Sequence, residues 1–166
     1  MNTLDMLFNF AAPEAAEPWQ VIDDGVMGGV SAGHWDHDPT GYAVFHGMVS
    51  LANNGGFSSL RSRPGDYRLA GRSGLRLRTR GDGQRYAFNV WPHPPLSRIA
   101  FQHRFLAERV WTDVDIPFAA LEPRFRGRRI EPAPRFDPNR ISAFGLLISD
   151  KQAGPFRLDI AWIAAF

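Results

Sequence analysis

The sequence predicts an all-β protein folded as an antiparallel β-sandwich or jelly roll. Its 13 prolines and 16 glycines are spread over 166 residues and divide the chain into short segments, which favours strands over helices. Several segments alternate apolar and polar residues, the pattern of a strand with one buried face. No segment has the apolar spacing of an amphipathic helix of three turns, and no strand–helix–strand rhythm is present.

The clearest alternation lies in the middle of the chain. At 75–80, three arginines face the side opposite Leu75, Leu77 and Thr79, as in a half-buried strand. The same pattern recurs at 86–91, 99–105 and 110–116, and further strands are expected at 7–10, 21–23, 42–51, 57–63, 143–149 and 156–164. Four prolines interrupt the stretch 118–140, so we expect a long loop there. Residues 1–166 are long enough to form one domain with its own core.

Composition excludes several classes of protein. The chain has no cysteine, which rules out disulfides, thiolate nucleophiles and thiolate metal sites. The net charge is only +2. The densest basic run, 124–129, contains Phe125, but Glu122 and Pro123 precede it and Glu131 follows, which is a weak match to the basic stripe of a nucleic-acid surface. No apolar segment is long enough to cross a membrane. Asp5 interrupts the apolar stretch at the start of the chain, which therefore does not resemble a signal peptide. We therefore expect a cytoplasmic protein that binds no nucleic acid.

Two glycine-rich stretches are the best candidates for a functional site. They read Asp-Asp-Gly-Val-Met-Gly-Gly-Val-Ser at 23–31 and Asn-Asn-Gly-Gly-Phe at 53–57. Paired glycines beside short polar side chains are typical of turns with positive φ, where a Cβ is costly. Because a rigid β scaffold would hold these turns, their polar residues are the first candidates for binding.

The motifs of known chemistry are weak here. Ser31 stands in a G-x-S-x-G match, but His34 to Pro39 cannot form the helix that a nucleophile elbow requires, so we expect Ser31 to bond within a turn. His34, Asp36, His37 and Asp38 are metal-ligand types, but we expect them on a solvated loop, where neighbouring side chains diverge.

Other polar groups leave alternatives open. Asp23 and Asp24 should face opposite ways in extended chain, and Asp24 with Asn53 and Asn54 could hold calcium through oxygen or simply cap turns. The chain contains no phosphate-binding glycine motif, so no nucleotide cofactor is indicated. Trp91 precedes a proline-rich stretch at the end of a predicted strand, where an aromatic ring can stack on a sugar or seat a peptide.

The motifs together resemble the complex I intermediate-associated protein 30 family. The resemblance rests on Trp19 with the block 23–31, on Phe45, Gly47 and 49–51, and on the block 53–57 with Ser59 and Arg61. Later segments agree as well: 116–118, 127–128, 144–148 and 154–160. It implies a galactose-binding-domain-like jelly roll and a non-catalytic role in assembly of respiratory complex I, and the chain is similar to the stand-alone bacterial members.

The residues and the resemblance predict a non-enzymatic binding module without a cofactor. Its partner would be a protein, such as a respiratory complex subunit or assembly protein, engaged during assembly of a respiratory or other redox complex. The predicted binding residues are Asp24, Met27, Ser31, Asn54, Arg61 and Trp91.

Each of these residues has an expected role. Asp24 and Asn54 would fix loop geometry or accept hydrogen bonds, Arg61 would donate a bidentate pair to a carboxylate or carbonyl group, and Met27 would offer an adaptable apolar contact. We expect Asp24, Asn54 and Arg61 to lie side by side at one rim of the sandwich. The alternatives are a carbohydrate or small ligand bound in a cleft with Trp91, and, third, hydrolysis through Ser31.

Overall fold

The fold consists of strands and short 3-10 turns. A computed structural model describes residues 3–93 and 98–166, with all their side chains except those of Val26 and Met27. The strands are β1 (Asp5–Asn9), β2 (Trp19–Asp23), β3 (Ala32–Asp38), β4 (Tyr42–Val49), β5 (Ser58–Ser62), β6 (Gly74–Arg80), β7 (Arg85–Pro92), β8 (Ala100–Leu106), β9 (Thr112–Pro117), β10 (Glu122–Phe125), β11 (Arg128–Arg129), β12 (Ile141–Ile148) and β13 (Gly154–Ala165). The turns are η1 (Pro13–Ala16), η2 (Asp24–Met27), η3 (Ala52–Asn54), η4 (Phe118–Ala120) and η5 (Pro138–Arg140). The predicted all-β class is confirmed.

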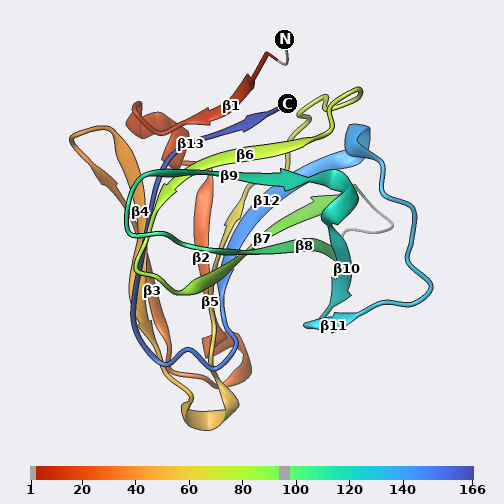
Figure 1. The fold of residues 1–166 in the computed structure, drawn as a ribbon. Coiled ribbons are helices and arrows are strands. Elements are labelled where there is room, and N and C mark those ends of the chain that lie inside the picture. Colours follow the sequence, from red (N-terminus) through yellow and green to blue (C-terminus); the bar gives the residue numbers. More distant parts are fainter. Residues whose placement is uncertain (1–2, 94–97) are drawn as a thin grey trace.

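The strands form two antiparallel sheets that pack face to face (Figure 1). Sheet A has the order β3-β4-β13-β6-β9, with β1 also paired to β13, and sheet B has the order β11-β10-β8-β7-β12-β5-β2. Sequential neighbours such as β7 and β8 pair directly, whereas β12 lies between β5 and β7. This crossing of early and late segments is the topology of a jelly roll.

The core lies between the two sheets. Sheet A contributes Phe45, Leu77 and Ile160, and sheet B contributes Phe88 and Phe144, all of them fully buried. Each comes from the inward set of an alternating strand, as the sequence pattern predicted for 75–80. On sheet B the outward residues Ala87, Asn89 and Gln102 are buried as well.

Two loop predictions were wrong. Residues 32–38, expected as a solvated loop, form the edge strand β3, in which Gly33, Trp35 and His37 are half-buried while Ala32, His34 and Asp36 are exposed. The stretch 118–140 contains β10, β11 and two 3-10 turns. Arg126 and Gly127 turn the β10–β11 hairpin with φ of 50° and 78°, the positive pair typical of a tight hairpin.

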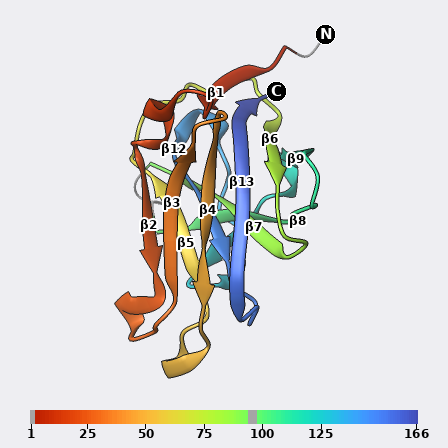
Figure 2. The ribbon, with the colours of Figure 1, turned by 90° about the vertical axis from the view of Figure 1, so that its left-hand side faces the viewer.

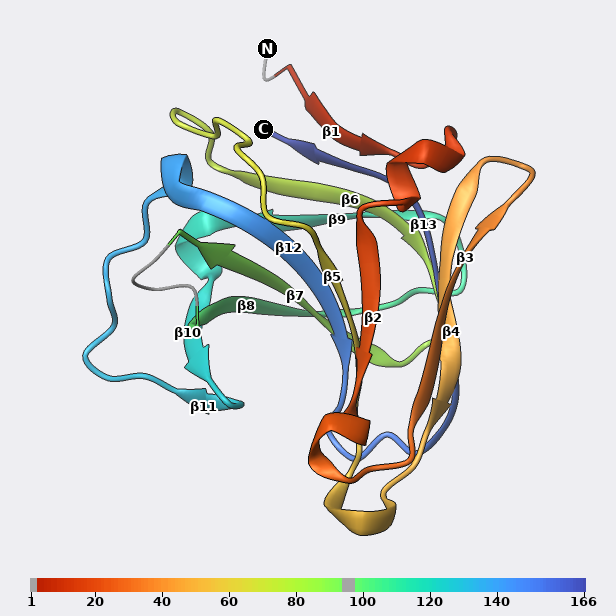
Figure 3. The same ribbon diagram turned by 180° about the vertical axis from the view of Figure 1, so that it is seen from behind.

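The two ends of the sandwich differ. The turns η2 and η3 project together at one end, and β1 and the C-terminal end of β13 lie at the other (Figure 2). On sheet B the β10–β11 hairpin runs in a different direction from β7 and β12 (Figure 3). This arrangement leaves two places to examine for function, the loop end and the outer face of sheet B.

Candidate functional site

The loop end is organised by the carboxylate of Asp24, the first residue of η2. It is fully buried. Its Oδ1 accepts a hydrogen bond from the Ser31 amide at 2.9 Å, and its Oδ2 accepts from the Ser31 hydroxyl at 2.6 Å. The same Oδ2 accepts from the amides of Gly56 at 2.7 Å and Phe57 at 3.4 Å. One side chain therefore ties the β2–β3 loop to the β4–β5 loop.

The glycines of the two motifs make room for this carboxylate. A Cβ at Gly29 would overlap the Asp24 carboxyl group, and one at Gly55 would lie 2.5 Å from its Oδ2. Gly28 instead provides a positive φ of 88° at the end of η2. The paired glycines are thus explained by close approach at one position and by backbone conformation at another.

Asp23 and Ser31 extend the same network, which we call the loop clamp (Asp23, Asp24, Ser31, Ser58 and the amides of 56–57). Asp23 accepts from the Gly33 amide at 2.9 Å and from the Ser58 hydroxyl. Ser31 also accepts from the Ser50 amide at 2.9 Å. As expected from alternation, the two neighbouring aspartates serve different contacts.

The hydrogen bonds also shift the ionisation of Asp24. Burial raises the pKa of its carboxyl group, but the hydrogen bonds from the Ser31 hydroxyl and from the amides of Ser31, Gly56 and Phe57 together lower the pKa by more than burial raises it. The net pKa lies below the ordinary value of 3.8. Asp24 is therefore ionised at neutral pH, as a buried acceptor of several donors should be.

The structure divides the predicted binding residues into two groups. Asp24 and Ser31 are bonded to each other within the loop clamp, and Asn54 lies exposed in the adjoining η3 with φ of 58°. Arg61 is paired with Gln20 three residues further along β5 than Ser58, about 10 Å away at the rise of a strand. The expected rim of Asp24, Asn54 and Arg61 is therefore wrong, because Asp24 points into a sealed interior. The side chain of Met27 lies outside the described residues.

Arg61 instead pairs with the other predicted residue, Trp91 of β7. Its guanidinium carbon lies over the indole ring, 4.1 Å from the centroid, within the range of a cation–π contact. Strand β12 lies between β5 and β7, and its Gly145 is the neighbour of Arg61 in register. A Cβ at Gly145 would lie 2.7 Å from the six-membered ring of Trp91. The missing side chain at Gly145 thus lets the indole lie across the sheet towards Arg61.

Arg61 belongs to a row of mostly polar residues on the outer face of sheet B. The register places Gln20, Arg61, Gly145, Asn89, Gln102 and Glu122 side by side on successive strands. Gln102 donates to Asn89 at 2.9 Å, and both amides are buried although they belong to the outward set. The sequence pattern of single strands could not reveal this row, because only the register brings its members together.

Three hollows open on or beside this face. One of about 230 Å³ is lined by Gln20, Ile22, Arg61 and Arg63 among others. Another, of about 610 Å³, lies between Leu147 and Phe57 on one side and Arg126 and Gly127 of the hairpin on the other.

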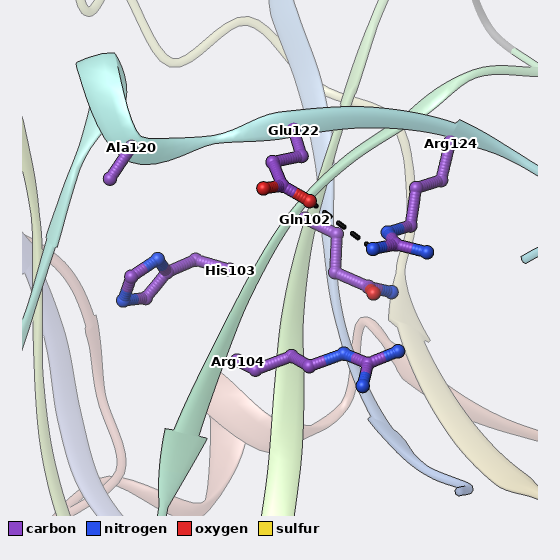
Figure 4. Close-up of a pocket in the computed structure, with 6 residues that line it drawn as sticks. All are labelled: Gln102, His103, Arg104, Ala120, Glu122 and Arg124. Atoms are coloured by element: carbon purple, nitrogen blue, oxygen red, sulfur yellow. Dashed lines mark hydrogen bonds and ion pairs between the residues drawn. The ribbon is translucent and has the colours of Figure 1, made fainter. Parts of the chain in front are cut away.

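The third hollow, of about 220 Å³, lies between β8 and β10. Figure 4 shows Gln102, Arg104 and Arg124 together on one side of it and His103 and Ala120 on the other. Arg124 contacts Glu122 at 3.2 Å. His103 is half-buried here.

The chemistry weighed for other residues has a structural explanation. Ser31 precedes an edge strand instead of an elbow helix, and its hydroxyl is engaged by Asp24 and Ser50. Asp36 contacts His46, and the His37 ring contacts the Phe10 carbonyl, so neighbours on β3 diverge. Within residues 3–93 and 98–166, no group of three or more His, Asp or Glu side chains is arranged to hold a metal ion. No helix in the same ranges is long and apolar enough to cross a membrane.

Comparison with known sequences finds one family model and several relatives that match this chain. The family model described as complex I intermediate-associated protein 30 matches residues 8–160. A mitochondrial protein of that name from Drosophila melanogaster is 25% identical over 96% of this chain, which spans 62% of that relative's length. The namesake from Neurospora crassa is 23% identical over 92% of the chain and 69% of the relative. An uncharacterised protein of Schizosaccharomyces pombe is 28% identical over 96% of the chain and 84% of its own length.

Comparison with solved structures identifies the fold. The family 11 carbohydrate-binding module of a Clostridium thermocellum cellulase superposes with a TM-score of 0.75 at 13% identity, covering 100% of this chain and 95% of the module. The same family's module in complex with a β-1,3-1,4-mixed-linked tetrasaccharide gives 0.73 at 13% identity, covering 98% and 95%. At this identity the likeness concerns the β-sandwich and not the ligand.

The loop clamp predicts that two neighbouring glycines respond differently to alanine. Gly29→Ala places a methyl group into the Asp24 carboxylate, so we expect the free energy of unfolding to fall by roughly 2–4 kcal/mol. Gly25→Ala is the matched control, because its Cβ meets nothing within 4 Å, and it should change stability by less than about 1 kcal/mol. Denaturant unfolding measures both, and equal losses in the two variants would contradict the clamp.

The ionisation of Asp24 predicts an acid-dependent contribution to stability. Because its folded pKa lies below 3.8, the carboxylate contributes stability that is full above that value and is lost as the pH falls through the folded pKa. The stability difference between wild type and Asp24→Asn should therefore be largest at pH 7 and shrink below pH of about 4. Chemical unfolding of both proteins across this range tests the sign. A difference that stayed constant or grew on acidification would show that the charge plays no part.

Proposed function

The chain belongs to the complex I intermediate-associated protein 30 family, and from that premise we propose a non-enzymatic module, residues 1–166, that binds a protein partner during assembly of a respiratory or other redox complex. Two of its relatives carry that family's name. The chain spans only part of the Drosophila relative, so the assembly role is carried over as a proposal and not as a property of the fold. A cytoplasmic location belongs to the proposal too, although both named relatives are mitochondrial.

The observation that carries the proposal is the outer face of sheet B. Arg61 is half-buried there, stacked on Trp91, beside a row of amide side chains. Arg61 has no ion-pair partner in the described part of the chain. Arginine and tryptophan are the residues most often found at the energetic centre of protein interfaces, and this pair lies where a partner can reach it.

The loop clamp supports a role without catalysis. The serine and the carboxylate that a hydrolase would use are bonded to each other in the interior, and Asp24 is fully buried. A substrate cannot reach this carboxylate, because it is buried between the two loops that it joins. In this proposal the clamp fixes the loop end, and binding takes place on the sheet.

The second candidate is carbohydrate binding on the same face. An aromatic ring beside amide and guanidinium groups is a common sugar platform, and solved modules of this fold include carbohydrate-binding ones. Against it, the Arg61 guanidinium covers one face of the Trp91 ring. A sugar stacking on that face would have to displace the cation.

Affinity capture from a native lysate of the source cells tests the leading proposal. We expect the tagged wild-type protein to enrich a respiratory or redox complex subunit, or an assembly protein, and Arg61→Ala to lose it. The control is Arg78→Ala, which removes an arginine from the opposite face, where it pairs with Asp113 at 2.9 Å. Mass spectrometry identifies the captured proteins. Enrichment of no such protein, or equal enrichment with all three baits, contradicts the proposal.

Thermal unfolding with added sugar separates the second candidate. Because Arg61 occupies the indole face, we expect no rise in melting temperature with a β-1,3-1,4-mixed-linked tetrasaccharide at any concentration. A bound ligand would instead raise the melting temperature progressively. A rise that grows with sugar concentration and disappears in Trp91→Ala would favour carbohydrate binding.

A further inference from the structure

We propose that the outer face of sheet B recognises carboxylate groups, presented by an extended acidic segment of the protein partner. This inference rests on the function proposed above and names the chemistry of the partner at that same face. Its starting point is the unequal way in which the arginines of the two sheets are paired.

On sheet A the arginines are neutralised by neighbouring strands. Those of β6 face aspartates of β9 and β13 in direct register: Arg76 with Asp115 at 2.5 Å, Arg78 with Asp113 at 2.9 Å and Arg80 with Asp159 at 2.8 Å. Arg157 of β13 also binds Asp159, at 2.9 Å. Cross-strand pairs of opposite charge stabilise a sheet locally. Each of these four arginines therefore already has a carboxylate partner, and Arg80 and Arg157 share Asp159.

At the β2–β5 edge of sheet B the arginines are left unmatched. Neither Arg61 nor Arg63 has a carboxylate partner among the residues that the structure describes. Both line the 230 Å³ hollow, together with Gln20, and none of the described residues lining it is acidic. Two guanidinium groups and a primary amide around one hollow form a donor-rich, positively charged site.

The environment of Arg61 favours a carboxylate as the missing group. The side chain is half-buried, and burial lowers the pKa of its guanidinium, although the group stays charged at neutral pH. A cation that has lost part of its water is stabilised most by an anion that also accepts its hydrogen bonds. The planar fork of arginine matches the two oxygens of a carboxylate, and Trp91 holds that fork in place by stacking.

A second unmatched cation indicates that the partner segment extends across the sheet. Arg126, at the turn of the β10–β11 hairpin, stacks on Phe125 and lines the 610 Å³ cavity with Leu147. In the described part of the chain it too lacks a carboxylate. Leu147 belongs to the same outward set of β12 as Gly145. An extended chain crossing this face could place one acidic side chain at Arg61 and another near Arg126.

A synthetic peptide of alternating glutamate and serine tests the inference with the full chain. Fluorescence anisotropy of the labelled peptide measures binding to wild type, Arg61→Gln, Arg61→Lys, Arg63→Gln and the control Arg78→Gln. We expect the peptide to bind wild type and Arg78→Gln equally and Arg61→Gln roughly tenfold or more weakly. Arg61→Lys keeps the charge but loses the fork, so it should be weakened less than Arg61→Gln. Melting temperatures of all variants establish that they are folded.

Four results would overturn the inference. The first is no binding of the glutamate peptide to wild type, and the second is equal binding of a lysine–serine peptide. The third is binding that Arg61→Gln and Arg78→Gln weaken alike. An oligogalacturonate serves as the acidic-glycan arm, and its binding in place of the peptide would also overturn the inference. The inference can fail while the proposed function stands: a captured partner that depends on Arg61 but does not compete with the glutamate peptide would keep the protein partner and reject its acidic character.

Discussion

The carboxylate of Asp24 is the interaction on which the loop end of this protein depends. It is buried, ionised and bonded to donors from two loops that are distant in the sequence. A buried charge is tolerated only when it is fully hydrogen-bonded. The loss of any one donor would therefore leave the carboxylate incompletely bonded. The glycines around it follow from the same constraint, because larger residues would overlap the carboxylate. The most recognisable part of the sequence therefore encodes the geometry of the loops, and it leaves the surface of sheet B as the place for recognition.

The two outer faces of the sandwich illustrate how one residue type can serve two purposes. On sheet A, register places aspartates opposite the arginines of β6. On sheet B, the neighbours of Arg61 in register are Gln20 and Gly145, which supply no charge. Gly145 also gives Trp91 the space to support the guanidinium. The net charge of +2 does not reveal this difference, because it sums paired arginines with arginines such as Arg61 that have no carboxylate partner among the described residues.

Much of the fold could be predicted from alternation and turn residues, since both are local properties of strands. Strand β6 was expected from Leu75, Leu77 and Thr79, and its inward set is buried. Strand β3 was missed because its outward set is His34 and Asp36, whose polarity suggests a loop when the paired strand β4 is unknown. The network of Asp24 and the stack of Arg61 on Trp91 depend on contacts across 32 and 30 residues of sequence. No local pattern carries such information, which is why Asp24, Asn54 and Arg61 were grouped wrongly while each drew attention by its residue type.

The edge strands of sheet A have a consequence for solubility. An unpaired strand edge invites another chain to add to the sheet, and charged side chains on edge strands oppose this. Strand β3 presents Asp36 and strand β9 presents Asp113 and Asp115 at the two borders of sheet A. A second chain added at either border would have to bury part of these charged side chains, and the loss of their hydration opposes the addition. Edge-to-edge growth into fibrils is thereby disfavoured at both borders of this sheet.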